Sequence, residues 1–320
     1  MTPGDVGVHA LGFGAASIGN LHRVVSDAQA HETLEAAWDG GIRYYDTAPH
    51  YGLGLSEKRL GTYLRTKPRD EFVLSTKVGR LLVPNPDFAG GRDLAHDFDV
   101  PDDLVRRFDP SRSGIRRSIE DSLTRLGLDR IDIAYLHDPD AYDLERGLGE
   151  GLPALAQLRD EGLVREIGVG VNDAAVAARA VREADLDVVM VAGRCSLLRP
   201  HGFDELIPDC AAKGTRIVAA APFNSGLLAT RDPAPGAQYD YKPAPPELIA
   251  KVARMAAVCE SHGVDLPTAA LQFPLRLPQV VAVVVGTARA AAVDENLARI
   301  ATPIPDELWA QLQSIDEEVE

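Results

Sequence analysis

The sequence predicts a single (β/α)8 barrel of the TIM type across residues 1–320, and three observations favour this α/β fold. Short apolar runs rich in β-branched residues alternate with longer amphipathic segments along the chain. The apolar runs lack polar alternation, which is typical of strands buried on both faces of a parallel sheet. Eight strand–helix pairs follow one another, and eight strands favour a closed barrel over a doubly wound sheet.

Each expected strand is followed by an expected helix. The strands are expected at 7–13, 42–46, 72–78, 131–137, 166–171, 187–192, 215–221 and 280–285. The helices are expected at 27–39, 56–66, 111–126, 151–161, 173–184, 204–213, 246–262 and 289–299. Ser26 and Asp173 stand where helix N-caps belong. Helix ends are marked by Gly40, Gly127, Gly162, Gly214 and Gly263. A tail from 305 to 320 predicts one extra C-terminal helix capped by Asp306.

Two connections are too long to be simple turns. They run from about 79 to 110, after the third strand, and from about 222 to 245, after the seventh. In a barrel, loops that follow strands lie on the C-terminal face, where long loops are usually functional. The aromatic residues of these loops that are candidates for a substrate pocket are Phe88, Phe98, Phe108, Tyr239 and Tyr241.

Composition excludes several classes of protein. Lys and Arg number 33 against 48 Asp and Glu, a net charge of −15, which disfavours a nucleic-acid or anionic membrane partner. The three cysteines, Cys195, Cys210 and Cys259, are far apart and form neither a disulfide framework nor a zinc motif, so we expect no metal. No apolar run is long enough to span a bilayer and no secretory signal is recognisable, so we expect a cytoplasmic protein.

Polar side chains follow three neighbouring strands where each one ends. Asp46 and Tyr51 follow the second strand, Lys77 ends the third, and His137 ends the fourth. These side chains should converge, because neighbouring strands lie about 4.8 Å apart. A lysine after a buried strand is costly unless it is paired, and Asp46 is its expected partner.

These four residues suit proton transfer. A tyrosine hydroxyl titrates near pH 10, and an adjacent ammonium favours the phenolate, so we expect Lys77 to lower the pKa of Tyr51. His137 is expected to hydrogen-bond the same substrate oxygen. Such a set handles the proton that accompanies a hydride, with Tyr51 as general acid or base.

A hydride requires a dinucleotide site. Gly12 to Ser17 nearly copies the dinucleotide-binding G-x-G-x-x-G fingerprint, but position 17 is Ser and no helix opens there. The better candidate is the segment 283–289, where the last strand runs into a helix, because barrels bind phosphate after strands seven and eight. The loop 221–228 after the seventh strand would supply the other wall.

The tetrad of Asp46, Tyr51, Lys77 and His137 resembles that of the aldo-keto reductase superfamily. Within it, the segments 48–57, 75–82 and 221–228 resemble the branch that contains aldose 1-dehydrogenases acting on L-fucose or D-threo-aldoses, L-galactose dehydrogenase and pyridoxal 4-dehydrogenase. The resemblance implies oxidation of an aldose hemiacetal at C1 to a lactone, with hydride transfer to NAD or NADP.

The resemblance also implies cofactor contacts. By position, these would be made by Asn172, Ser225, Leu227, Gly286, Thr287, Arg289, Glu295 and Asn296. The tyrosine that stacks on nicotinamide in many members is replaced here by Cys195. Members that prefer NADPH carry cations where this chain has Gly286 and Ala292, so NAD is favoured, although Arg289 could still reach a 2′-phosphate.

Several alternatives stay open from the sequence. The substrate could be pyridoxal, or a broad range of aldehydes and ketones reduced with NADPH. A third reading, of another class, is a non-catalytic barrel that senses nucleotides as a regulatory subunit. In every enzymatic reading the partner is a small molecule, a sugar or a pyridoxal-like aldehyde, and the sequence says nothing about oligomeric state.

Overall fold

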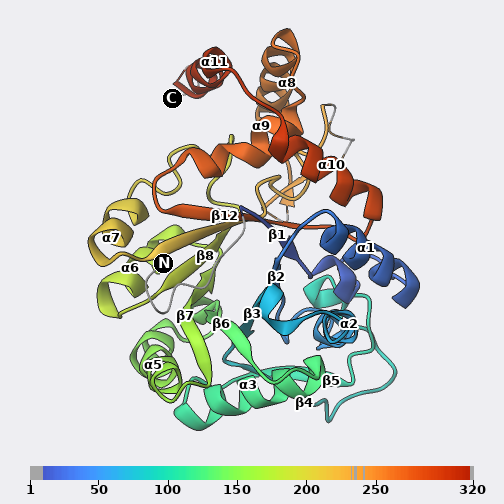
Figure 1. Cartoon of the computed structure of the whole chain (residues 1–320), viewed down its shortest axis with the longest axis vertical. Helices are drawn as coiled ribbons and strands as arrows, with labels where there is room; N and C mark the ends of the chain where they lie inside the picture. The colour runs from blue at the N-terminus through green and yellow to red at the C-terminus, as the bar shows by residue number, and fades with distance from the viewer. Residues whose placement is uncertain (1–9, 232, 234–235, 241, 318–320) are drawn as a thin grey trace.

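Eight parallel strands close into a barrel in a computed structural model that describes residues 10–231, 233, 236–240 and 242–317 (Figure 1). The strands are β1 Leu11–Gly14, β2 Tyr44–Asp46, β3 Val73–Val78, β6 Ile131–His137, β7 Val164–Val171, β8 Val188–Ala192, β9 Arg216–Ala220 and β12 Val280–Gly286. Their order around the barrel is β1-β12-β9-β8-β7-β6-β3-β2. The predicted fold is confirmed, and residues 7–9 of the first expected strand lie outside the described residues.

In the part of the chain that the structure describes, eight helices surround the barrel. They are α1 Asp27–Asp39, α2 Leu55–Leu64, α3 Arg112–Leu126, α5 Leu152–Asp160, α6 Ala174–Glu183, α7 Leu206–Lys213, α9 Leu266–Gln272 and α10 Ala290–Ala301. The predicted N-caps are confirmed, because the Ser26 hydroxyl accepts from the Gln29 N–H and the Asp173 carboxylate accepts from the Ala175 N–H. Gly127 and Gly214 end their helices in the left-handed conformation, which glycine adopts without strain.

The helix after the seventh barrel strand differs from the prediction. The expected helix at 246–262 exists as α8 Pro246–Ser261, but it packs on α11 Asp306–Glu317 and on α9. Figure 1 shows α8 and α11 side by side beyond one end of the helix ring. The seven-residue α9, which the sequence analysis missed, joins the ring against α10. The predicted extra C-terminal helix is confirmed as α11, but Asp306 is its first helical residue and not the cap that precedes it. Residues 318–320 of the expected tail lie outside the described residues.

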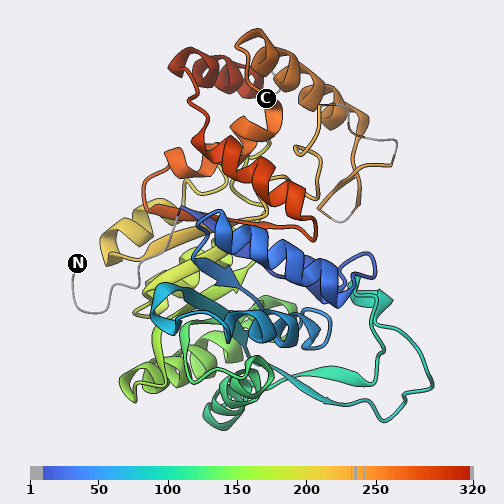
Figure 2. The same cartoon turned by 45° about the vertical axis from the view of Figure 1, so that its right-hand side comes forward.

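The two long connections are confirmed, and both contain short strands. After β3 the chain forms an antiparallel hairpin of β4 Arg80–Pro84 and β5 Leu104–Phe108, which extends away from the barrel in Figure 2. After β9 it forms the smaller pair β10 Gln238–Tyr239 and β11 Lys242–Pro243. Neither hairpin was predicted.

A chain of buried hydroxyls crosses the barrel interior and ends at the predicted site. The Tyr44 hydroxyl lies 3.2 Å from that of Tyr135 and 3.1 Å from Ser75 Oγ. Ser75 in turn donates to Asp46 Oδ1 at 2.7 Å. Buried polar groups hold a unique geometry when each has a partner, so this chain of hydroxyls fixes the position of Asp46 Oδ1.

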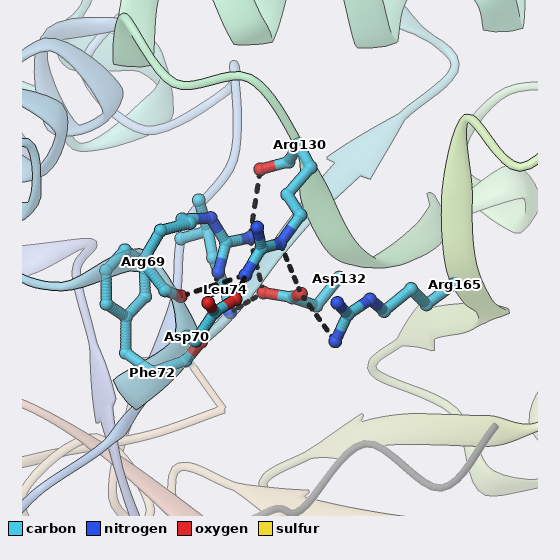
Figure 3. A network of polar contacts seen from close by, with 7 residues as sticks. All are labelled: Arg69, Asp70, Phe72, Leu74, Arg130, Asp132 and Arg165. Atoms are coloured by element: carbon cyan, nitrogen blue, oxygen red, sulfur yellow. Dashed lines mark hydrogen bonds and ion pairs between the residues drawn. The ribbon is translucent and has the colours of Figure 1, made fainter. Parts of the chain in front are cut away.

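The opposite end of the barrel carries an ionic cluster (Figure 3). Asp132 lies at the start of β6 and accepts from the Leu74 N–H at 2.8 Å and from Arg69 Nη2 at 2.6 Å. Arg130 and Arg165 approach the same carboxylate at 3.8 and 3.7 Å. The cluster therefore ties β3, β6 and β7 together at their amino-terminal ends.

Candidate active site

A cavity of about 770 Å³ opens at the C-terminal ends of the barrel strands. All four predicted catalytic residues line it: Asp46, Tyr51, Lys77 and His137. They come from β2, the loop after β2, β3 and β6, which are neighbours in the barrel order. The site is therefore assembled where this fold places active sites.

Asp46 and Lys77 form a buried ion pair. Lys77 Nζ lies 2.6 Å from Asp46 Oδ2 and donates a second hydrogen bond to the Thr47 carbonyl at 3.1 Å. Burial alone would lower the pKa of Lys77, but the nearby Asp46 and Tyr51 raise it, and the net pKa lies above its ordinary value. The lysine is consequently held charged and in a fixed position.

Tyr51 lies against this ammonium, with Lys77 Nζ 4.7 Å from the centre of its ring. Burial raises the pKa of the Tyr51 phenol above its ordinary value, and Lys77 lowers it by a smaller amount through its charge and a hydrogen bond. Lys77 therefore acts on the pKa of Tyr51 in the expected direction, but burial outweighs it, and the net pKa lies above the ordinary value. The lysine opposes the effect of burial without overcoming it.

His137 completes the set. Its ring centre lies 6.1 Å from that of Tyr51, with the planes nearly perpendicular at 88°. Burial, followed by the charges of Arg80 and Lys77, lowers the pKa of His137 well below its usual range, so the imidazole is neutral at physiological pH. A neutral imidazole has one N–H to donate, which suits it to a substrate oxygen.

Asp138 directly follows His137, and it contacts several other residues of the site. It accepts from Arg80 Nη2 at 2.6 Å and from the Asn172 side-chain amide at 3.2 Å. Its Oδ2 also lies 3.4 Å from His137 Nε2. Asp138 therefore connects a predicted catalytic residue to a predicted cofactor residue. The signal that could have found it is its position directly after a catalytic residue at a strand end.

The predicted cofactor residues divide into two groups. Asn172, Ser225 and Gly286 line the cavity together with the catalytic residues. The other five are not among its lining residues: Leu227, Thr287, Arg289, Glu295 and Asn296. The Leu227 side chain packs instead in the apolar cluster formed with α8 and α11.

Glu295 and Asn296 are held within α10. Arg299 Nη1 donates to Asn296 Oδ1 at 3.1 Å and lies 3.6 Å from Glu295 Oε2. Arg289 is the N-cap residue of this helix and makes no side-chain cap hydrogen bond, so the first N–H groups of α10 remain available near Gly286. Helix N-termini of this kind suit phosphate.

The loop after β9 has the features of a cofactor cradle. Ala221, Asn224 and Ser225 all have positive φ angles, of 53°, 45° and 57°. The N–H groups of Ala221 and Asn224 donate to the carbonyls of Val284 and Ala221, so these tight turns are held by the loop's own hydrogen bonds. Asn224 is buried and lines the cavity, and its Oδ1 has no hydrogen-bond partner among the described residues. An unpaired buried carbonyl oxygen is costly, so the groove fits a ligand that carries donors as well as phosphates.

Of the predicted pocket aromatics, Phe98 lines the cavity. Phe88 is exposed, Phe108 stacks on Tyr142, and the Tyr239 hydroxyl accepts from Arg199. Tyr241 lies outside the described residues. Sequence analysis gave no role to His50 and His96, which also line the cavity.

Cys195 is buried and does not line the cavity, whereas Arg194 and Phe223 do. Burial raises the pKa of the Cys195 thiol to about 12, so it stays protonated. Within the described residues, no three His, Cys, Asp or Glu side chains gather closely enough to hold a metal ion. The helices that the structure describes include none with the length and apolar character needed to cross a bilayer.

Comparison with known proteins adds an independent observation. The sequence profile of the Aldo/keto reductase family matches residues 10–317. The chain belongs to the aldo/keto reductase family. Together with its dehydrogenase relatives, this makes it an NAD(P)-dependent oxidoreductase, as predicted, and does not favour the non-catalytic alternative.

Two curated relatives of this aldo/keto reductase cover nearly all of it. D-threo-aldose 1-dehydrogenase of a Pseudomonas species is 55% identical across 95% of this chain and 93% of its own length. Pyridoxal 4-dehydrogenase of Microbacterium luteolum is 39% identical across 96% of this chain and 94% of its own. The solved glycerol dehydrogenase of Gluconobacter oxydans has a TM-score of 0.75 at 22% identity, covering 95% of this chain and 90% of that chain, and supports the fold alone.

Proposed function

We propose that this aldo/keto reductase oxidises an aldose, as its cyclic hemiacetal, at C1 to a lactone with NAD as the hydride acceptor. The observation that carries the proposal is the Asp46–Lys77 pair beside Tyr51 and His137 at the wall of one cavity. The 55% identity to D-threo-aldose 1-dehydrogenase supports the choice of an aldose.

The reaction requires one hydride and one proton to leave the substrate. A bound nicotinamide would supply the hydride acceptor. In oxidation, the Tyr51 phenolate would take the hemiacetal proton, and Lys77 would stabilise the charge on the phenolate while Asp46 holds the ammonium in place. His137 would donate its N–H to the same substrate oxygen. Positioning by these groups supplies catalysis without a covalent intermediate.

The cofactor would occupy the part of the cavity lined by Asn172, Ser225 and Gly286. Asn172 donates its side-chain N–H to Asp138, which leaves its side-chain oxygen to accept from an amide such as the nicotinamide carboxamide. We favour NAD over NADP because Gly286 and Ala292 place no cation where a 2′-phosphate would need one. Arg289 is the residue that would weaken this preference.

A substrate panel tests the proposal. The purified protein with NAD⁺ or NADP⁺ should form reduced nicotinamide from aldoses, followed at 340 nm. Tyr51→Phe should lower kcat by about 10²–10⁴-fold while cofactor binding is retained, since this is the usual contribution of a proton-transfer group. A variant that keeps more than about a tenth of the rate would remove Tyr51 from that role.

Pyridoxal is the second candidate substrate, favoured by the 39% identity to pyridoxal 4-dehydrogenase. Including pyridoxal in the substrate panel separates the two candidate substrates.

We also propose that residues 1–320 act as one domain, a view supported by the span of the family match. The three described cysteines are all free and buried, which suits the reducing cytoplasm.

A further inference from the structure

His50 lines the cavity immediately before Tyr51 and takes no part in the mechanism above. Its ring centre lies 5.6 Å from that of His137 and 6.0 Å from that of Tyr51. It is therefore close to the oxygen that those two residues would share. The question is which hydrogen-bonding group His50 presents to a substrate.

Arg106 answers it. This arginine lies in β5, and its side chain is only 4% exposed. Its Nε donates to His50 Nδ1, and its Nη2 donates to the His50 carbonyl at 2.9 Å. The same guanidinium makes two hydrogen bonds to the Asp93 carboxylate, which is itself buried. The arginine is thus clamped between Asp93 and His50.

The clamp selects one tautomer. Because guanidinium donates only, His50 Nδ1 has to be an acceptor, and the single ring proton of the neutral imidazole sits on Nε2. Burial, followed by the charges of Arg106 and Arg80, lowers the pKa of His50 to about 2, so the ring stays neutral. None of the described residues bonds to Nε2, which leaves its N–H free for a ligand.

The surroundings of His50 suit a polyol. Phe98 lies edge-to-face with His50 at 5.4 Å and next to Tyr51 at 6.1 Å, giving an apolar surface for sugar C–H groups. His96 and Asp97 line the same part of the cavity and add polar groups. A rigid donor beside an aromatic wall favours substrates that carry hydroxyls near the reacting carbon.

We propose that His50, held by Arg106 as an Nε2–H donor, recognises the C2 hydroxyl of the aldose next to the reacting C1. This inference rests on the proposed function and extends it to a specificity-determining residue. Arg106 and Asp93 are positioning residues in this arrangement, since they act on the substrate through His50.

The test compares two sugars that differ only at C2. D-arabinose and 2-deoxy-D-ribose share every other centre, so the ratio of their kcat/KM values measures the contribution of the C2 hydroxyl. In the wild type this ratio should be about ten or more, the equivalent of one good hydrogen bond. In His50→Leu it should fall close to one, whereas His50→Asn, which keeps a donor, should retain part of the preference.

Arg106→Met should lower the ratio as well, and the double variant with His50→Leu should match the His50→Leu single variant. Both sugars are measured on the same preparation, so a misfolded fraction cancels from the ratio. Turnover of D-arabinose with an unchanged ratio in His50→Leu would overturn this inference and leave the proposed function standing. Failure of the wild type to oxidise any aldose would overturn the proposed function, and this inference with it.

Discussion

Tyr51, Lys77 and His137 show how one cavity sets the protonation of three titratable side chains. Burial raises the pKa of Tyr51, the Asp46 carboxylate keeps Lys77 charged, and burial with Arg80 and Lys77 keeps His137 neutral. Groups whose pKa values are driven apart in this way mark the acid and base of an active site.

These directions predict the pH dependence of oxidation. The reaction needs the Tyr51 phenolate, and a pKa raised above its ordinary value means that this form appears only at alkaline pH. We expect kcat/KM for aldose oxidation to rise with pH and to be still rising at about pH 9, without a limb from His137, which is neutral throughout. Initial rates at saturating NAD⁺ measure this. A plateau beginning below about pH 8 would show that Tyr51 ionises more easily than its surroundings imply.

Among the elements, the barrel strands and most of their helices were predictable, and the hairpins were not. The barrel strands are buried on both faces and read as plain apolar runs, whereas β5 alternates exposed and half-buried residues outside the barrel. The amphipathic pattern of α8 predicts a helix but does not say which surface it covers. It covers α11, a contact between distant parts of the chain.

The residues of the candidate site were likewise predictable only in part. The tetrad was predictable because its residues lie at the ends of neighbouring strands or, for Tyr51, in the loop that follows one, and the fold fixes where these ends lie. The role of His50 was not, because it depends on Arg106 and Asp93, and these meet His50 only through the unpredicted hairpin. The position of a residue in the sequence is enough to predict that it ends a barrel strand and faces the site. The contribution of a long loop to the site depends on tertiary contacts, which the sequence pattern does not show.

At the level of one element, the N-cap of α1 can be tested separately. The Ser26 hydroxyl accepts from the Gln29 N–H at 3.1 Å, on a helix that packs against α2 and α10. Ser26→Ala should lower the free energy of unfolding by about 1 kcal/mol, because one N–H of the first turn loses its partner. Ser26→Asp restores an acceptor and should leave stability within about 0.5 kcal/mol of the wild type, measured by urea unfolding. Equal losses in both variants would mean that the hydroxyl does not act as a cap.

In the whole molecule, the candidate active site lies at one end of the barrel and the ionic cluster around Asp132 lies at the other. The cavity lies at the C-terminal ends of the strands, while Asp132, Leu74 and Arg165 lie near the amino-terminal ends of β6, β3 and β7. A barrel of this kind confines catalytic residues to one end and leaves the other to stability.

Asp132→Ala tests that separation. The carboxylate is 1% exposed and pairs with Arg69 at 2.6 Å, so its loss leaves a half-buried guanidinium without its main partner. Breaking such a pair costs about 3–5 kcal/mol, and we expect a loss of that order in urea unfolding. The matched control is Asp70→Ala, because Asp70 is 89% exposed where it pairs with Arg130, and such pairs contribute about 1 kcal/mol or less. The kcat of folded Asp132→Ala should stay within about twofold of the wild type, since none of the cluster's side-chain hydrogen bonds or ion pairs among the described residues reaches a residue that lines the cavity. A large fall in kcat at unchanged stability would instead show that this end of the barrel is coupled to catalysis.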